Sequence, residues 1–256
     1  MTGPETWGPF DQHGFDARVE WGPHGLRRLA RACEVVVIID VLSFTTALDV
    51  ALGRGATVLP YRFADDRQAA YATAASALLA VGRRATDDDH PYSLSPATLQ
   101  ALPAGSRLVL PSPNSSALAF GAAEAGARVV LAACLRNAAA VAAAARAAGG
   151  AVGVVPAGER WHGNTGPLRP ALEDLLGAGA LLTALAPSAP SPEARAAMAA
   201  FSEAAPDLGR RLEECASGRE LIEAGFPEDI RLSAELDISP VAPRLDCQAF
   251  VDGSRG

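Results

Sequence analysis

The sequence contains no lysine, because all 22 of its basic residues are arginine. That absence excludes a lysine Schiff base and the lysine of a phosphate-binding loop. Four cysteines are present, far apart and without a C-x-x-C pair: Cys33, Cys134, Cys215 and Cys247. This spacing favours free, chemically idle thiols in a reducing compartment over a metal or redox site.

Long apolar runs are missing as well. No run reaches the roughly 18–20 residues of a membrane span without an arginine, glycine or proline. Residues 1–10 are polar and contain proline and glycine, unlike the apolar core of a signal peptide. We therefore expect a cytoplasmic protein with no membrane partner.

Basic residues are fewer than acidic ones, 22 against 29, so the formal net charge is −7. Such a protein repels phosphate backbones, so we expect no nucleic-acid partner. Hydrophobic residues make up 49% of the chain and charged residues 20%, which excludes intrinsic disorder. A chain of 256 residues buries on the order of 70–75% of its unfolded surface, enough for one large domain. The composition leaves a monomer and a homodimer open.

Apolar runs rich in β-branched residues alternate with helix-like stretches. The runs are Glu34–Val41, Ala56–Pro60, Arg107–Pro111, Ala127–Leu131 and Ala151–Pro156, and the helix-like stretches are Phe44–Leu52, Asp65–Ala80, Ser115–Ala125 and Asn137–Ala148. Continuous hydrophobicity indicates strands that are buried on both faces. The order therefore predicts a three-layer α/β fold, with a mostly parallel sheet and helices on both of its faces.

The chain is expected to form a single domain over residues 1–256. Its sheet-forming part covers about residues 30–183, and a helical and tail part covers about 193–256, with the tract Ala184–Pro192 as a linker between them. The second part contains expected helices at Glu193–Ala204 and Leu208–Ala224, then one or two strands within Ile230–Val251. The similar units LGRGATVLP and EAGARVVLAA are compatible with two related halves and equally with ordinary helix-to-strand turns.

Ligands of open parallel sheets bind beyond the carboxyl ends of the strands, next to helix N-termini. The first run ends in Asp40, followed by the hydroxyls of Ser43, Thr45 and Thr46. An acid beside hydroxyls at a helix start suits a metal ligand next to an anion cradle. The alternative is ordinary helix capping, with Asp40 favourable near the positive end of the helix.

Three further strand ends also carry polar side chains. These are Asn114, Ser115 and Ser116 after the run at 107–111, Arg136 and Asn137 after the run at 127–131, and Gly158, Glu159 and Arg160 after the run at 151–156. Hydroxyls, amides and arginines of this kind can hold the oxygens of an anion, and they also serve as caps or surface residues. The polar loop after the last run leads to Glu173 and Asp174, which are candidate metal ligands or acids that stabilise a helix start.

Several other motifs are weaker or absent. The acids in Asp87–His90 are consecutive and would point in different directions, which favours a solvated loop. His13, His24 and His162 lack the spacing of a zinc site. The sequence has no G-x-S-x-G elbow and no G-x-G-x-x-G after a strand, so a serine hydrolase elbow and a dinucleotide fingerprint are missing.

Five segments follow one another along most of the chain, from about Val35 to Pro243. They are VVVIIDVLSFTTALDVALGRGATVLPY, LVLPSPNSSALAF, LAACLRNAAAVA, VVPAGERWHGNTGPLRPALEDLLGAGALL and SGRELIEAGFPEDIRLSAELDISPVAP. In this order they resemble the 2-phosphosulfolactate phosphatase family, the magnesium-dependent phosphatases of coenzyme M biosynthesis. The resembling family motifs include D-V-L-R-A-[ST]-T-T, T-T-T-N-G-T, F-L-N-A-S-A-V-A and S-x-E-D-x-x-C-A-G.

The resemblance implies functional roles at Asp40, Asn114, Asn137, Glu173 and Asp174, and backbone-shape roles at Gly158, Gly177 and Gly179. The chain also departs from the family motifs. Ser43 stands where D-V-L-R has its arginine, and Ser115 replaces the glycine after Asn114. The segment at Val81–Pro96 matches the family's L-G-N-S-P region only weakly.

The leading hypothesis is a Mg²⁺-dependent phosphatase for a small anionic phosphomonoester, with Asp40, Glu173 and Asp174 as metal ligands. Asn114 joins these acids in the expected catalytic set. The expected substrate contacts are Ser43, Thr45, Thr46, Ser115, Ser116, Arg136, Asn137, Gly158, Glu159 and Arg160. We expect another arginine to replace the one missing at Ser43, with Arg136 favoured over Arg160 and Arg62. The alternative is a non-catalytic or repurposed anion-binding protein on the same fold.

Overall fold

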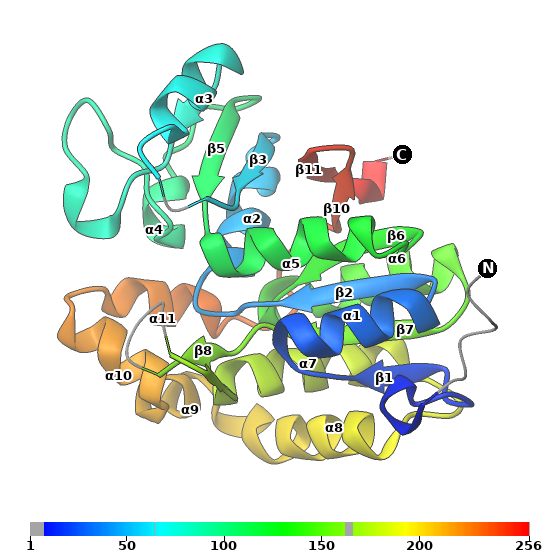
Figure 1. Cartoon of the computed structure of the whole chain (residues 1–256). Helices are drawn as coiled ribbons and strands as arrows, with labels where there is room; N and C mark the ends of the chain where they lie inside the picture. Colours follow the sequence, from blue (N-terminus) through cyan, green and yellow to red (C-terminus); the bar gives the residue numbers. More distant parts are fainter. Residues whose placement is uncertain (1–7, 64, 162–165, 256) are drawn as a thin grey trace.

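The computed structural model describes residues 8–63, 65–161 and 166–255. Its main feature is a nine-stranded sheet with the strand order β1-β7-β2-β6-β10-β11-β3-β5-β4 (Figure 1). In that order the strands are Ala17–Val19, Val152–Pro156, Val35–Ile39, Val129–Ala133, Pro243–Asp246, Ala249–Asp252, Thr57–Tyr61, Arg107–Pro111 and Leu78–Leu79. A separate antiparallel pair joins β8 (Glu159–Arg160) to β9 (Leu168–Arg169).

The large sheet consists of two parallel groups joined by an antiparallel hairpin. Strands β1, β7, β2 and β6 run parallel to one another, as do β3, β5 and β4. The hairpin β10–β11 pairs with β6 on one side and with β3 on the other, both antiparallel. Figure 1 shows this hairpin above β6 and beside β3. The mostly parallel three-layer fold expected from the sequence is confirmed, while a kinship between the two halves stays a prediction.

Alternating residues of β2 supply the two faces of the sheet. Val35, Val37 and Ile39 pack into one hydrophobic cluster, whereas Val36 and Ile38 pack into the other. All five side chains are fully buried. Successive strand residues point to opposite faces, so a strand covered on both sides must be apolar at every position.

Helices cover both faces of the sheet (Figure 1). The first cluster is closed by α6 (Ala138–Ala148), α7 (Leu172–Leu185), α8 (Pro192–Ala204), α9 (Leu208–Glu214) and α11 (Pro227–Ser233). The second is closed by α1 (Gly22–Ala32), α2 (Phe44–Gly53), α4 (Pro96–Leu99) and α5 (Pro113–Glu124). Within the described residues, no helix combines the length and the hydropathy needed to cross a membrane.

Three sequence-based expectations about elements need correction. The stretch Asp65–Ala80 is helical only over α3 (Gln68–Ala74), because Ser76 takes a positive φ of 50° and the chain turns into β4. The stretch 208–224 splits at Cys215 into α9 and α10 (Ala216–Glu223), and the Cys215 Sγ accepts a hydrogen bond from the N–H of Gly218. Strand β1 and helix α1 were not expected from the sequence.

Helix α8 belongs to the same core as the sheet. Its residues Ala194, Ala197 and Phe201 are buried in the cluster that β2 and α7 form. Gly179 of α7 allows this close approach, because a Cβ there would lie 2.2 Å from the carbonyl oxygen of Ala197. The tract at 184–192 thus connects two packed helices.

All four cysteines are free thiols, as expected. Cys33, Cys134 and Cys215 are buried, and Cys247 is exposed. Burial raises the pKa of the Cys33 thiol to about 11 and that of Cys215 to about 12. The buried thiols therefore stay protonated near neutral pH.

Candidate functional site

The candidate site lies at the carboxyl end of β2, where three chain segments meet. Asp40 follows the last residue of β2 and is partly exposed. One of its carboxylate oxygens, Oδ1, accepts a hydrogen bond from the backbone N–H of Phe44 at 3.2 Å. The other, Oδ2, accepts one from the hydroxyl of Ser115 in α5. Asp40 is thereby oriented by the N-terminal turns of both α2 and α5.

Asp174, in the first turn of α7, locks two other strand ends together. Its Oδ1 accepts from the N–H of Val41 at 2.8 Å, and its Oδ2 accepts from the N–H of Gly158 at 2.8 Å. The carboxyl group is buried, with an exposed fraction of 3%. Asp174 therefore joins the end of β2 to the end of β7 and fixes the turns that carry Asp40 and Glu159.

Gly177 explains how α7 comes so close to β2. A Cβ at this position would lie 2.7 Å from Cγ2 of Val41 and 2.8 Å from Cγ2 of Ile39. Gly158 takes a positive φ of 65°, and a Cβ there would lie 2.9 Å from the carbonyl oxygen of Arg169. Both glycines thus serve the shape of the backbone around the site.

The acids of this region repel one another. Burial raises the pKa of Asp40, and the charge of Glu173 raises it further, against lowering by Ser115 and the Phe44 N–H. Burial, Asp40 and Glu173 likewise raise the pKa of Asp174. Together with Glu159, these acids form a cluster of four in which burial and like charge favour a bound proton or a bound cation over free carboxylates.

Glu159 of β8 is the fourth of these acids. Burial raises its pKa to about 7, and the charges of Asp40, Glu173 and Glu220 add to the shift. Arg169 opposes the shift only in part. Near neutral pH the Glu159 carboxyl therefore exchanges a proton readily, which suits a general acid or base.

A cavity of about 600 Å³ opens beside these acids. Its lining includes Leu42, Arg83, Arg84, Glu159, Glu220 and Phe226. The cavity thus lies between the end of β2, the 3₁₀ turn η2 (Arg83–Ala85), β8 and α10. Its size suits a small molecule, and arginines and glutamates face it from different elements.

Other expected substrate contacts serve the backbone instead. The hydroxyl of Thr45 donates to the carbonyl oxygen of Asp40 at 2.7 Å, and that of Thr46 donates to the carbonyl oxygen of Val41 at 2.8 Å. Both side chains are fully buried. They hold the turn from β2 into α2, and contact of these hydroxyls with phosphate stays a prediction.

Asn137 and Arg136 also have internal partners. The Oδ1 of Asn137 accepts from the N–H of Cys134 at 2.9 Å. The guanidinium of Arg136 donates from Nε to Asp49 Oδ2 at 2.8 Å and pairs with Glu235 as well. Arg136 is thus held in an ion-pair network that joins α2 to the segment after α11, and its expected role as an anion ligand stays a prediction.

Three expected site residues remain, namely Asn114, Arg160 and Ser116. Asn114 Nδ2 donates to the carbonyl oxygen of Gly158 at 3.1 Å, so its amide lies beside the acids. Arg160 donates from Nη1 to the carbonyl oxygen of Gly166 at 3.2 Å, within the β8–β9 loop. Ser116 is fully buried, and its Oγ has no hydrogen-bond partner within the described part of the chain.

The remaining expectations from the sequence concern Arg62, the Asp87–His90 loop and His162. Arg62 pairs with Glu124 at 2.7 Å and stacks on Phe120, away from the cavity lining. Asp87 and His90 pair with each other in an exposed turn, as a solvated loop predicts. His162 lies outside the described residues.

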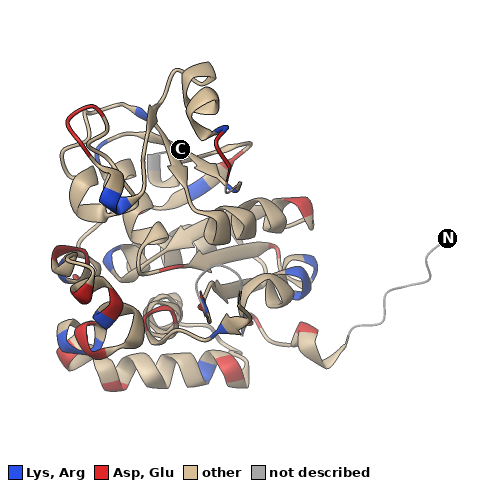
Figure 2. Cartoon of the chain, turned by 60° about the vertical axis from the view of Figure 1, so that its left-hand side comes forward, with Lys and Arg blue, Asp and Glu red and all other residues tan. Residues whose placement is uncertain are grey.

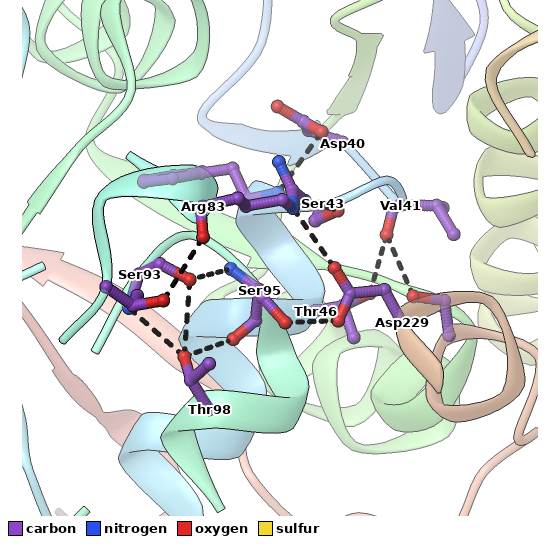
Figure 3. Close-up of polar contacts among 12 residues, drawn as sticks. Asp40, Val41, Ser43, Thr46, Arg83, Ser93, Ser95, Thr98 and Asp229 are labelled. Atoms are coloured by element: carbon purple, nitrogen blue, oxygen red, sulfur yellow. Dashed lines mark hydrogen bonds and ion pairs between the residues drawn. The ribbon is translucent and has the colours of Figure 1, made fainter. Parts of the chain in front are cut away.

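Sequence reasoning missed Arg83. Its Nη2 donates to the hydroxyl of Ser43 at 2.5 Å, and its Nε donates to Asp229 Oδ2 at 3.1 Å (Figure 3). Arg83 lies in the Val81–Pro96 segment, which matched the family motifs only weakly. The only signal in the sequence was the pair of adjacent arginines at 83–84, and it gives no indication that this turn folds back onto Ser43.

The acidic side chains of the site can be tested for their fit to Mg²⁺. Within residues 8–63, 65–161 and 166–255, no three His, Cys, Asp or Glu side chains are arranged to hold a metal ion. Mg²⁺ is, however, usually bound through one or two carboxylates, with water and substrate phosphate supplying the other ligands. Asp40 and Glu173 suit such a site because their repulsion would be relieved by a cation. Asp174 fits less well, since it is buried and backbone N–H groups engage both of its oxygens, whereas Asp40 is partly exposed and accepts one backbone N–H and one hydroxyl.

The fold and this site define an α/β protein with an acidic cluster and an arginine-lined cavity at the carboxyl edge of its sheet. The family model of 2-phosphosulpholactate phosphatase matches residues 24–248, nearly the whole chain. The chain therefore belongs to the 2-phosphosulpholactate phosphatase family, as the order of its motifs indicated. No curated protein matches the sequence.

Proposed function

We propose that the chain is a Mg²⁺-dependent phosphatase that hydrolyses a small anionic phosphomonoester. The observation that carries this proposal is the acidic cluster of Asp40, Glu159, Glu173 and Asp174 beside a cavity that also presents arginine. Membership in a phosphatase family supports the reaction type. Negative charge concentrated at one strand edge suits a divalent cation, and arginine suits an oxyanion.

Asp40 and Glu173 would hold the metal ion. When bound, Mg²⁺ would polarise the phosphoryl group and neutralise the charge that develops on its oxygens. Asp174 acts as a positioning residue, because its bonds to the N–H groups of Val41 and Gly158 fix the turns on either side of Asp40. Ser115 orients the Asp40 carboxylate through its hydroxyl.

The residues around the cavity would bind and protonate the substrate. Asn114 lies close enough to Gly158 to offer its amide to a phosphate oxygen at the same strand end. Glu159, with a pKa of about 7, would give its proton to the oxygen of the leaving alcohol. An attacking water and an aspartyl phosphate on Asp40 are both compatible with this arrangement.

A panel of phosphomonoesters assayed with Mg²⁺ and with EDTA tests the proposal. Turnover should require Mg²⁺, and Asp40→Asn should lower kcat by about 10²–10³-fold, the usual loss when a charge-stabilising group is removed. Asp66→Asn, at an exposed position, is the matched control and should leave turnover unchanged. Full activity in Asp40→Asn, or in EDTA, would contradict the proposal.

The two routes of attack can be separated chemically. A single turnover is quenched and reduced with borohydride, which converts an aspartyl phosphate into homoserine. A mass change at Asp40 would show the covalent route, whereas an unmodified Asp40 together with released phosphate would show direct attack by water.

A non-catalytic anion-binding protein is the second candidate. The observation that favours it is that, among the described residues, no three His, Cys, Asp or Glu side chains are arranged to hold a metal ion, while two arginines line the cavity. It predicts no turnover across the panel but a higher Tm in the presence of inorganic phosphate. Mg²⁺-dependent turnover would exclude it.

A further inference from the structure

Helices cover the two faces of β3 and β5 unequally. Val58 and Leu108 pack into the large cluster that α1, α2, α4 and α5 close. Leu59, Tyr61 and Val109 point to the other face, into a small cluster to which α3 contributes the helical residues. In Figure 1, α3 lies at the top of the molecule above these strands. A helix of seven residues is only about 10 Å long, so it leaves part of this face uncovered.

A cavity of about 750 Å³ opens beside this small cluster. It lies between the end of β3, α3, the C-terminal half of α5 and the turn of the β10–β11 hairpin. Four of its lining residues are aromatic, namely Tyr61, Phe63, Tyr71 and Phe120. We refer to this space as the aromatic cavity. Its size suits a small molecule, and its lining suits a ring.

The rings of the aromatic cavity support one another. The ring centre of Tyr61 lies 5.6 Å from that of Phe63 and 5.4 Å from that of Tyr71, with the planes inclined by 73° and 39°. Phe63 is nevertheless 48% exposed. Aromatic rings attract further rings in such edge-to-face and offset arrangements. A bound aromatic group would therefore cover an apolar surface that now faces water.

Arg62 provides donors beside these rings. Its guanidinium carbon lies 5.4 Å from the centre of the Phe63 ring and 5.3 Å from that of Phe120. Its Nη1 donates to Glu124 at 2.7 Å, and Glu124 is its only hydrogen-bond partner within the described part of the chain. All five N–H groups of arginine lie in the plane of the guanidinium, so rings that lie over it leave the donors of Nε and Nη2 available. Two such donors fit the two oxygens of a carboxylate.

The charge of the aromatic cavity also favours an anion. Its lining contains Arg62 and Arg67 against the single acid Glu124. The ion pairs of both arginines are exposed, at 37% and 63% for Arg62 and Glu124, and at 76% and 29% for Arg67 and Asp65. Exposed pairs contribute little to stability, so a ligand can compete for these arginines. A cationic ligand would be repelled, and a neutral one would leave the donors of Arg62 unused.

We infer that the aromatic cavity binds a small aromatic carboxylate, with its ring against Phe63 and Tyr71 and its carboxylate on Arg62. This site is separate from the acidic cluster. Helix α5 begins beside Asp40 with Ser115 and ends at Glu124, and nine residues at 1.5 Å each place these two about 14 Å apart along its axis. The inference does not depend on the proposed function, because the two cavities share no lining residue among those that the structure describes.

Three probes test which chemistry the aromatic cavity selects. 2-Naphthoate carries a ring system and a carboxylate, 2-naphthalenemethanol carries the rings alone, and cyclohexanecarboxylate carries the carboxylate without an aromatic ring. Their affinities for the full chain are measured by titration calorimetry. Each of the two partial probes should bind at least about 10-fold more weakly than 2-naphthoate, because one lacks the charged hydrogen bonds and the other lacks the ring contacts.

Two variants assign these contributions to residues. Arg62→Gln should weaken 2-naphthoate by about 10-fold and leave 2-naphthalenemethanol within about 2-fold, because only the charge is lost. Phe63→Ala should weaken both by about 2- to 12-fold, the usual range for one aromatic pair. The matched controls are Arg231→Gln and Phe10→Ala, at exposed positions outside the aromatic cavity, and they should change neither affinity.

Cys247 shows where the probe binds. It lines the aromatic cavity and is exposed, whereas the other three cysteines are buried. Iodoacetamide should therefore label the folded chain at Cys247, which mass spectrometry follows over time. At ten times its Kd, 2-naphthoate fills about nine-tenths of the sites, so the rate of labelling should fall by as much as about 10-fold. Cyclohexanecarboxylate at the same concentration should leave the rate nearly unchanged.

Several results would overturn the inference. A wild type that binds no 2-naphthoate would do so, as would equal affinities for 2-naphthoate and either partial probe. An unchanged rate of labelling at Cys247 would place the bound probe elsewhere. A chain that forms dimers in sedimentation analysis, with Cys247 protected in the dimer and no affinity for 2-naphthoate, would assign this face to a second copy of the chain instead.

Discussion

The Glu159 carboxyl carries the clearest prediction at the scale of single residues. Its pKa is about 7 in the folded chain against an ordinary value of 4.5. Between these values the folded chain binds more protons than the unfolded chain, so stability falls as the pH rises through that window. Glu159→Gln removes this contribution. From pH 5 to pH 8, the Tm of the wild type should therefore fall further than that of Glu159→Gln.

The measurement is a pair of thermal melts without Mg²⁺, each recorded in matched buffers at several pH values. Glu193→Gln is a suitable control, because Glu193 lies exposed in the first turn of α8 and is not one of the four acids of the cluster. Its pH profile should follow that of the wild type. Identical profiles for Glu159→Gln and the wild type would show that Glu159 titrates normally.

Residue types at strand ends predicted part of the site. Asp40, Asn114, Ser115 and Glu159 do lie together, because parallel strands deliver their carboxyl ends to the same edge of the sheet. Hydroxyls such as that of Thr45 were less predictable, since the same group can bind a ligand or satisfy a strand-end carbonyl. The sequence shows which groups are available, whereas their direction depends on packing.

At the scale of the elements, the contact between α7 and β2 depends on Gly177. A Cβ would lie 2.7 Å from Cγ2 of Val41, so Gly177→Ala overpacks this contact. We expect a loss of about 1–3 kcal/mol in the free energy of unfolding, measured by urea denaturation. The proposed Mg²⁺-dependent activity should fall too, because Asp174 lies one turn earlier on the same helix.

Gly209 in α9 provides the matched control. Nothing lies within 4 Å of the position that its Cβ would occupy. Gly209→Ala should therefore stabilise the chain by roughly 0.4–1 kcal/mol, because alanine loses less backbone entropy on folding. A stable Gly177→Ala would mean that α7 can move away from β2 without cost.

Elements buried on both faces were the easiest to predict. The runs that form β2 and β7 are apolar at every position, because helices cover both of their sides. Strand β1 was not predicted because it has only three residues, too few to show a periodic hydrophobic pattern. The alanine-rich stretch 65–80 read as one helix, since alanine favours helix wherever nothing else intervenes. The positive φ of Ser76, which ends that helix, leaves no trace in composition.

Charged helices surround one end of the molecule. Figure 2 shows acidic and basic positions interleaved along the helices at its lower left. Arg210 pairs with Asp207 at 2.6 Å and Arg231 with Glu228 at 2.6 Å, both three residues apart. Such exposed pairs contribute about 0–1 kcal/mol each. The stability of the molecule therefore rests on its apolar clusters.

At the scale of the whole molecule, Phe250 joins the two parallel groups. It lies in β11, is fully buried, and packs edge-on against Phe44 of α2 with ring centres 6.2 Å apart. Phe250→Ala should lower the free energy of unfolding by about 3–5 kcal/mol in urea denaturation. Phe10→Ala, at a position that is 65% exposed, should change it by no more than about 0.5 kcal/mol. Equal effects of the two variants would contradict a joining role for Phe250.

The position of the hairpin late in the chain has a consequence for synthesis on the ribosome. Strand β7 is complete at Pro156, whereas β10 begins only at Pro243. Until then β6 and β3 are bare edges, with unpaired N–H and carbonyl groups and no partner strand between them. Nascent chains of this length are open to pairing with one another, and any stop before Pro243 leaves both edges exposed permanently. The hairpin therefore covers the two strand edges at which nascent chains could otherwise pair with one another.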